Sequence, residues 1–141
     1  MNLTANVTKN FTLKELLQSN TADKYKISEQ YNPSDLVIHN LELLAKNVLQ
    51  PLREGLGIPI TLNCAYRCKR VNSLIPGSST TSDHLKGSAA DIDLNNKELN
   101  KKVFDWIKNN CEFKQLINEH DYSWIHVSFV EGGNRMQVLK T

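Results

Sequence analysis

The sequence is most informative at SDHLKGSAAD, residues 82–91. Here His84 comes at the end of a polar loop, and Asp91 lies near the start of an apolar stretch that predicts a strand. A turn at Gly87 would fold the two side chains toward each other. Because neutral imidazole and carboxylate are preferred ligands of Zn²⁺, this segment predicts part of a zinc site.

A third candidate ligand is His126, in the middle of a predicted strand at 124–129. A catalytic zinc site has three protein ligands and leaves the fourth position to water, whereas structural zinc usually has four protein ligands. Two His and one Asp fit the catalytic count. Each residue taken alone has an ordinary alternative, since a strand His is often hydrogen-bonded within its sheet and an Asp is often a cap or turn residue.

Three helices are predicted around these residues. The capping box at 12–15 starts a short helix that runs to about residue 19. Apolar residues spaced by three or four positions predict a long helix over 33–57, in which Pro51 should kink or shorten the last turn. A second capping box, starting at Asn95, predicts a helix that ends near residue 110.

Five strands complete the prediction. They are expected at 58–63, 89–94, 115–118, 124–129 and 136–139. The segment 67–83 is rich in turn-forming residues and predicts a long loop, and Gly132-Gly133-Asn134 predicts a hairpin between the last two strands. With helices mostly first and strands mostly last, we expect an α+β domain with a small antiparallel sheet.

Length and charge narrow the function without naming it. A chain of 141 residues fits one domain, and a net charge of +2 is too small for binding nucleic acid or anionic lipid through bulk charge. No apolar run is long enough to span a bilayer, and the first residues lack the features of a signal peptide. We expect the three cysteines, Cys64, Cys68 and Cys111, to be small buried or half-buried thiols rather than metal ligands.

The pattern Ser-x-His-x-x-Gly-x-Ala-x-Asp at residues 82–91, followed later by a strand His, resembles the signature of a peptidase family. This family comprises the zinc D-alanyl-D-alanine carboxypeptidases and L-alanyl-D-glutamate endopeptidases, which share their fold with the amino-terminal signalling domain of hedgehog proteins. The similarity covers roughly residues 10–130. It also includes the segments 11–16 and 19–22, which resemble the opening of compact, often phage-borne members, and Cys64-Ala65-Tyr66-Arg67, Asn72 and Gly77.

The resemblance implies a single zinc peptidase domain over residues 1–141, with helices packed on one side of a small antiparallel sheet. It implies Zn²⁺ held by His84, Asp91 and His126. The family's general base is a carboxylate a few residues before the last His. The carboxypeptidase form has it at the position of Ser123, which cannot act as a carboxylate base.

Two nearby carboxylates can replace that base, Glu119 and Asp121. We prefer Glu119, because it ends a strand predicted to pair beside His126. Arg67 matches the family's arginine near the metal, where it would bind a substrate carboxylate or stabilise the oxyanion of the tetrahedral intermediate. Substrate contacts are expected from Ser82 and Tyr66.

The implied function is hydrolysis of peptide bonds in peptidoglycan stem peptides, by a carboxypeptidase or an endolysin-type endopeptidase. We expect a monomer without nucleic-acid partners or membrane insertion, which stays cytoplasmic until its release or is associated with a phage, and which acts on the cell wall. The alternative is a catalytically silent zinc-binding module of the same fold, for example in a phage particle. Ser123 keeps that alternative open.

Overall fold

The computed structural model describes residues 2–141, and it confirms an α+β domain with helices packed alongside a small sheet. The amino-terminal half holds β1 (Asn6–Thr8), β2 (Phe11–Thr12), α1 (Leu13–Leu17), α2 (Asn20–Tyr25), the 3-10 helix η1 (Ser28–Tyr31), α3 (Asp35–Leu44), the π-helix η2 (Ala45–Leu49), α4 (Gln50–Leu56) and β3 (Leu62–Cys64). The second half holds α5 (Lys69–Leu74), the 3-10 helix η3 (Asp83–Lys86), β4 (Ala89–Ile92), α6 (Lys97–Asn110), β5 (Gln115–Glu119), β6 (Trp124–Ser128) and β7 (Gln137–Lys140).

The main sheet has five strands in the order β3-β4-β6-β5-β7, and β1 and β2 form a separate pair. All neighbours in the main sheet are antiparallel except β5 and β7, which are parallel. The register places Asp91 of β4 opposite His126 of β6, and His126 opposite Ile117 of β5. Side chains at paired positions point to the same face of a sheet, so these three share one face.

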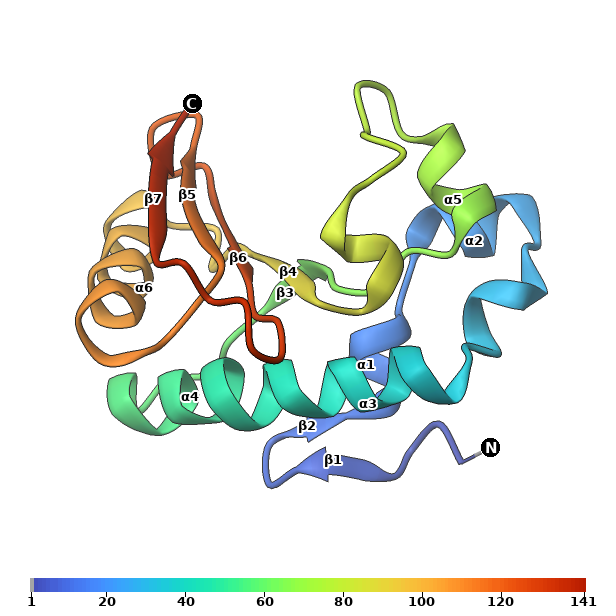
Figure 1. Cartoon of the computed structure of the whole chain (residues 1–141), viewed down its shortest axis with the longest axis horizontal. Helices are drawn as coiled ribbons and strands as arrows, with labels where there is room; N and C mark the ends of the chain where they lie inside the picture. Colours follow the sequence, from blue (N-terminus) through green and yellow to red (C-terminus); the bar gives the residue numbers. More distant parts are fainter. Residues whose placement is uncertain (1) are drawn as a thin grey trace.

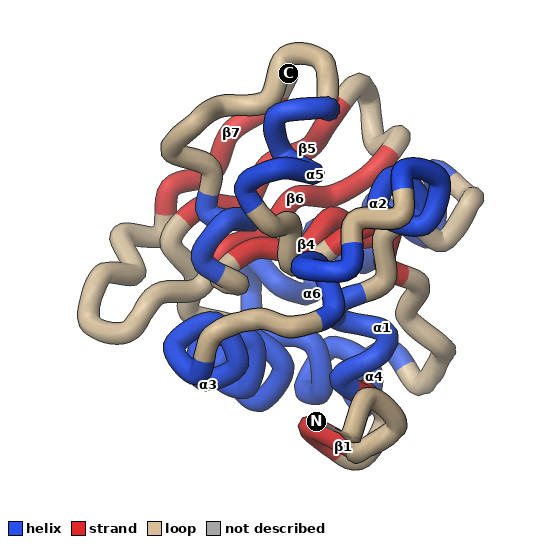
Figure 2. Tube along the Cα trace, turned by 90° about the vertical axis from the view of Figure 1, so that its right-hand side faces the viewer, coloured by secondary structure: helices blue, strands red, loops and turns tan. Residues whose placement is uncertain are grey.

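The two faces of this sheet have different neighbours. Helix α6 packs against β5 and β6 on one face. Helix α5 and the loop after it stand on the other side of the sheet, across a gap (Figures 1 and 2). That second face is the one that carries Asp91 and His126, so the predicted ligands point away from the core.

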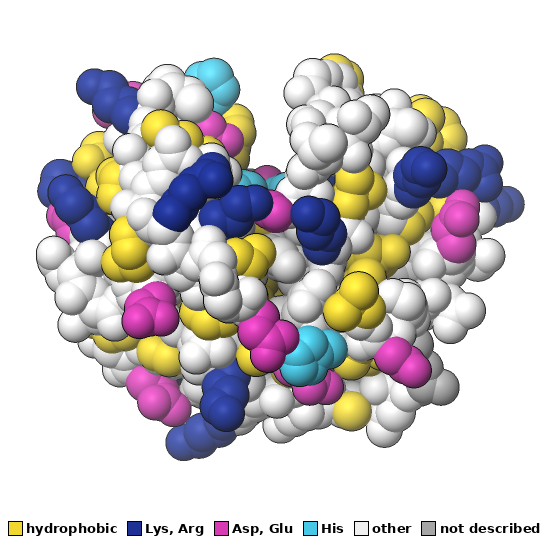
Figure 3. Space-filling view, in the orientation of Figure 1, with side chains coloured by type: hydrophobic (Ala, Val, Ile, Leu, Met, Phe, Trp, Pro, Cys, Tyr) yellow, Lys and Arg dark blue, Asp and Glu magenta, His cyan; other side chains and the backbone are white. Residues whose placement is uncertain are grey.

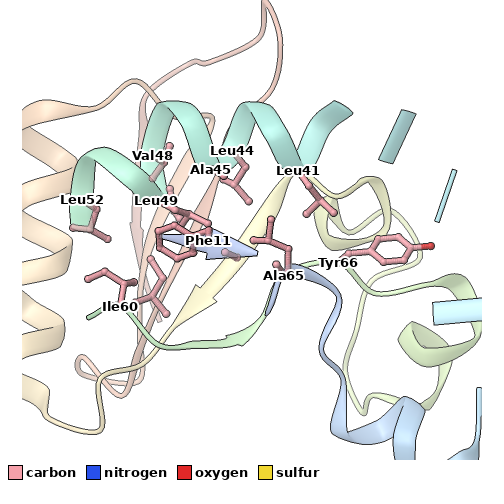
Figure 4. Close-up of a cluster of buried hydrophobic side chains, with 14 of the residues drawn as sticks. Phe11, Leu41, Leu44, Ala45, Val48, Leu49, Leu52, Ile60, Ala65 and Tyr66 are labelled. Carbon is pink, nitrogen blue, oxygen red and sulfur yellow. The ribbon is translucent and has the colours of Figure 1, made fainter. Parts of the chain in front are cut away.

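The long helix predicted over 33–57 is formed by α3, η2 and α4 in succession (Figure 1). Its predicted apolar stripe is buried, and Figure 4 shows part of it against Phe11 and Ile60. Pro51 does not end the helix. It lacks an amide hydrogen and its ring crowds the preceding turn, and the chain widens into the π-helical turn η2 just before it. The helix then continues to Leu56 and ends at Gly57, whose φ is 67°.

The predicted hairpin at Gly132-Gly133-Asn134 is wrong. The last strand, β7, pairs in parallel with β5 and not with β6. The reason is that β4 and β5 already occupy both edges of β6, so the chain must cross to the free edge of β5. It enters that edge through hydrogen bonds from Met136 N to Phe113 O and from Gln137 N to Lys114 O.

Two local predictions also need correction. The segment 67–83 is not all loop, because it contains α5, whose six residues are too few to show a helical period. The helix α6 begins one residue later than predicted: the side chain of Asn96, not Asn95, accepts from Leu99 N, while Asn95 has a φ of 56°. The capping box at Thr12 and Glu15 is confirmed.

Gly87, in the turn between His84 and Asp91, is sterically required. Its φ is +74°, and a Cβ there would lie 2.8 Å from the backbone oxygen of Val37. We expect Gly87→Ala to lower the free energy of unfolding by about 2–3 kcal/mol, measured by urea denaturation. Gly57→Ala is the matched control, since its φ is +67° but nothing lies within 4 Å; it should cost about 1 kcal/mol. Equal losses in both variants would show that the contact with α3 does not matter.

Candidate active site

His84 is held in one orientation by the backbone. Its Nδ1 lies 2.6 Å from the carbonyl oxygen of Ala65. A carbonyl oxygen can only accept, so Nδ1 carries a proton, and Nε2 is the nitrogen that offers a lone pair when the imidazole is neutral. Nε2 lies 3.3 Å from Oδ1 of Asp91. The Oγ of Ser82 accepts from the backbone N of His84 and caps the short helix η3. This is the arrangement of a metal-binding histidine whose other nitrogen is fixed by a neighbour.

The structure brings the three predicted ligands together. Nδ1 of His126 lies 3.0 Å from Oδ1 of Asp91, and the rings of His84 and His126 are 5.2 Å apart between centroids. Residue 84 reaches this point from η3, while the other two come from adjacent strands. One oxygen atom therefore lies between two imidazole nitrogens.

The charges of this group are strongly coupled. Burial by itself would lower the pKa of His84, but hydrogen bonds to Asp91 and Cys64 outweigh it and raise the pKa to about 10. Burial likewise would raise the pKa of Asp91, but hydrogen bonds from His126 and His84 hold it below its ordinary value. Asp91 is thus a carboxylate that attracts positive charge from two sides.

Cys64 is a member of the group that sequence reasoning missed. Its Sγ lies 3.5 Å from Nδ1 of His84, and ligand atoms of Cys64, His84 and Asp91 all lie within 4.8 Å of one another. These three residues can hold a metal ion by their donor types and spacing. The predicted half-buried thiol is confirmed for Cys64, but its position beside His84 and Asp91 was not predicted. Cys64 lies beside Asp91 because β3 pairs with β4, and this pairing was not predicted from the sequence.

The side chains of His84, Asp91 and His126 line a cavity of about 560 Å³ between the sheet and the loop after α5, and Cys64 does not line it. Figure 3 shows the hollow between two lobes, with His and acidic side chains at its bottom. Its walls combine the loop 75–82 with the open face of the sheet. The polar and aromatic side chains that line it include Arg67, Ser82, Asp83, His84, Asp91, Lys114, Gln115, Glu119, Trp124, His126 and Arg135.

The two candidate bases occupy different places. Glu119 lines the cavity and is the diagonal neighbour of His126 on the same sheet face, a separation of about 7 Å between Cα atoms. Its Oε1 accepts from the hydroxyl of Thr141, 3.1 Å away. Asp121 does not line the cavity; its side chain is 85% exposed and lies 3.6 Å from Nζ of Lys97.

Of the expected substrate contacts, two line the cavity and one does not. Arg67 Nη2 lies 3.4 Å from Oγ of Ser82, and the backbone N of Arg67 donates to the carbonyl oxygen of His84. Within residues 2–141, Nε of Arg67 is buried and has no hydrogen-bond partner. Tyr66 is buried at the edge of the apolar core and does not line the cavity, so the geometry gives no support to its expected substrate contact (Figure 4).

An ion pair that the sequence did not predict anchors the segment carrying His84. Lys114 Nζ lies 3.0 Å from both carboxylate oxygens of Asp83, and the Asp83 side chain is only 7% exposed. The pair joins η3 to the start of β5, so it fixes His84 relative to the sheet. The two residues are 31 positions apart, and no local pattern links them.

Of two comparisons with known proteins, one finds a match and the other finds none. Within residues 2–141, no helix combines the length and apolar character needed to cross a membrane. No curated protein matches the chain. The family model described as peptidase M15 matches residues 9–128, which is most of the sequence and includes every predicted metal ligand. The chain therefore belongs to the peptidase M15 family.

Proposed function

We propose that this protein is a zinc peptidase that hydrolyses peptide bonds in peptidoglycan stem peptides. The observation that carries the proposal is the convergence of His84 Nε2, Asp91 Oδ1 and His126 Nδ1 at a cavity. Two nitrogen donors and one carboxylate fit a catalytic zinc site that leaves a coordination position to water. Membership in the peptidase family supports the reaction class.

The donor atoms also favour one ligand set over another. Because Ala65 O holds the proton on Nδ1 of His84, Nε2 is the nitrogen that a neutral His84 offers to a metal, and it faces Asp91. Cys64 lies near Nδ1, the nitrogen already engaged. We therefore propose His84, Asp91 and His126 as the zinc ligands, with Cys64 as a neighbour of His84. A cation there would also balance the negative charge of the Asp91 carboxylate.

The chemistry needs a base close to the metal. Zinc bound at this site would lower the pKa of its water and polarise the scissile carbonyl. We assign to Glu119 the removal of the proton from the attacking water and its transfer to the leaving amine. Its place on the cavity wall supports this assignment, while the exposed position of Asp121 does not.

Arg67 is proposed to bind an oxygen anion of the substrate. Its guanidinium lines the cavity, and its buried Nε lacks a partner among residues 2–141. A buried donor without an acceptor costs free energy, so an arriving carboxylate or oxyanion would be stabilised there. A terminal carboxylate on Arg67 would make the enzyme a carboxypeptidase, and oxyanion stabilisation would suit an endopeptidase.

The silent zinc module has less support than the enzyme. It was motivated by Ser123, whose hydroxyl donates to His120 O in the turn after β5. Glu119 supplies a carboxylate on the cavity wall, so the serine does not leave the site without a base. The resemblance to compact phage-borne members leads us to propose the bacterial cell wall as the site of action.

Digestion of purified muropeptides tests the proposed function. We expect the zinc-loaded protein to cleave them and a chelator to reduce the rate at least a hundredfold, because the metal supplies both the nucleophile and the electrophile. Mass spectrometry of the products would identify the bond that is cut. A shortened stem that loses one terminal residue indicates a carboxypeptidase, and two larger fragments indicate an endopeptidase. Intact muropeptides after prolonged incubation would favour the silent module.

A further inference from the structure

We propose that Arg135 is a specificity-determining residue that binds a carboxylate of the substrate at the part of the cavity wall next to β7. The proposal rests on the proposed peptidase function and deepens it, because it assigns an acidic group to the peptide away from the bond that is cut. Arg135 lies beyond residues 9–128, so membership in the family does not imply this role.

The position of Arg135 follows from the strand order. Arg67 lies three residues after the end of β3, and Arg135 lies two residues before the start of β7. Strands β3 and β7 are the two edge strands of the sheet. Both residues line the cavity. Strands β4 and β6, which carry Asp91 and His126, lie between these two edge strands.

The guanidinium of Arg135 is held in place without being neutralised. Its Nε and Nη2 donate to Oε1 of Gln137 over 3.2 and 2.9 Å, and Gln115 Nε2 donates to the same oxygen over 2.9 Å. An amide oxygen carries no net charge, so the guanidinium keeps its full positive charge. A planar guanidinium with a fixed orientation is suited to a carboxylate, and less entropy is lost when the carboxylate binds.

The other charges on the cavity wall leave Arg135 without an ionic partner. Lys114 is paired with Asp83 through both carboxylate oxygens. Within residues 2–141, Arg135 forms no ion pair. Figure 3 shows Lys and Arg side chains on both sides of the hollow. The cavity therefore offers a free cation at the β7 edge, and a carboxylate is its chemical complement.

The test uses a peptide substrate with a carboxylate on each side of the scissile bond and two analogues, each with one carboxylate converted to the carboxamide. We expect one of these conversions to lower kcat/KM about tenfold in the unmodified enzyme, the scale of a charge-assisted hydrogen bond. On the peptide with both carboxylates, Arg135→Gln should also lower kcat/KM about tenfold. In this variant, the same carboxamide conversion should cause no further loss of kcat/KM. Arg135→Lys keeps the positive charge but loses the two parallel N–H groups of the guanidinium, so it should retain part of the preference for the carboxylate over the carboxamide.

The matched control is Arg70→Gln, which removes the same charge from an exposed residue outside the cavity. It should keep the full preference, which separates a local contact from the loss of net charge. The proposal is overturned if Arg135→Gln lowers kcat/KM equally on the diacid and both analogues, or leaves all three unchanged.

Failure of the proposed function is distinguishable from failure of this inference. If the unmodified enzyme cleaves none of the three peptides, the peptidase proposal fails. Binding of the same peptides to the zinc-loaded protein, measured by isothermal titration calorimetry, then decides the role of Arg135. The contact is supported if the unmodified protein binds the diacid about tenfold more tightly than one carboxamide analogue and Arg135→Gln loses this preference. Equal affinities for the three peptides, or no binding, overturn it.

Discussion

His84→Ala and His126→Ala should each reduce bound zinc from about one equivalent to less than half an equivalent and lower peptidase activity at least a thousandfold. Each substitution removes one of the three proposed ligands, and two remaining donors would not hold zinc firmly. Plasma emission spectrometry of the purified protein measures the metal, and muropeptide digestion measures the activity. Activity that returns on adding excess zinc would show that the site is weakened but otherwise intact.

Cys64→Ser is the variant that separates the two possible ligand sets. The sulfur lies within 4.8 Å of donor atoms of His84 and Asp91, so a site built from these three residues would lose its metal in this variant and keep it in His126→Ala. We expect the opposite result, because His84 Nδ1 is engaged by Ala65 O and Nε2 faces Asp91. Zinc retained in Cys64→Ser and lost in His126→Ala supports the proposed set. The reverse pattern would replace His126 by Cys64.

The parts of the site that were predictable from sequence are those encoded locally. His84, Gly87 and Asp91 lie within one segment, and the turn that joins them requires a glycine with positive φ beside α3. The buried apolar residues of the long helix were also predictable, because their spacing of three or four positions is a local property of the sequence. Such features depend on residues that are close together in the sequence, so they can be predicted from one sequence without knowing which strands pair.

The features that sequence reasoning missed depend on pairings between distant segments. Cys64 enters the group only because β3 pairs with β4, and Lys114 reaches Asp83 only because β5 begins near η3. The turn residues Gly132-Gly133-Asn134 indicate that the chain bends there, but they do not indicate which strand β7 pairs with. The occupied edges of β6 decide that β7 joins β5, and this places Arg135 at the cavity.

Glu119→Gln should lower kcat by a factor of about 10² to 10⁴ while zinc content stays near that of the unmodified protein. Glutamine keeps the size of the side chain and can still accept from Thr141, but it cannot take a proton from water. Asp121→Asn is the matched control. Its carboxylate is exposed and points to Lys97 outside the cavity, so this variant should retain its activity.

The two variants together decide the assignment of the base. Loss of activity in Asp121→Asn with full activity in Glu119→Gln would mean that the turn after β5 rearranges to bring Asp121 to the cavity. That turn has three consecutive residues with positive φ, His120, Asp121 and Tyr122, and it is held by hydrogen bonds from Tyr122 N to Asn118 and from Ser123 N to Glu119. A rearrangement would break these bonds. The geometry therefore favours Glu119, which already lines the cavity with the proposed metal ligands and needs no change of backbone.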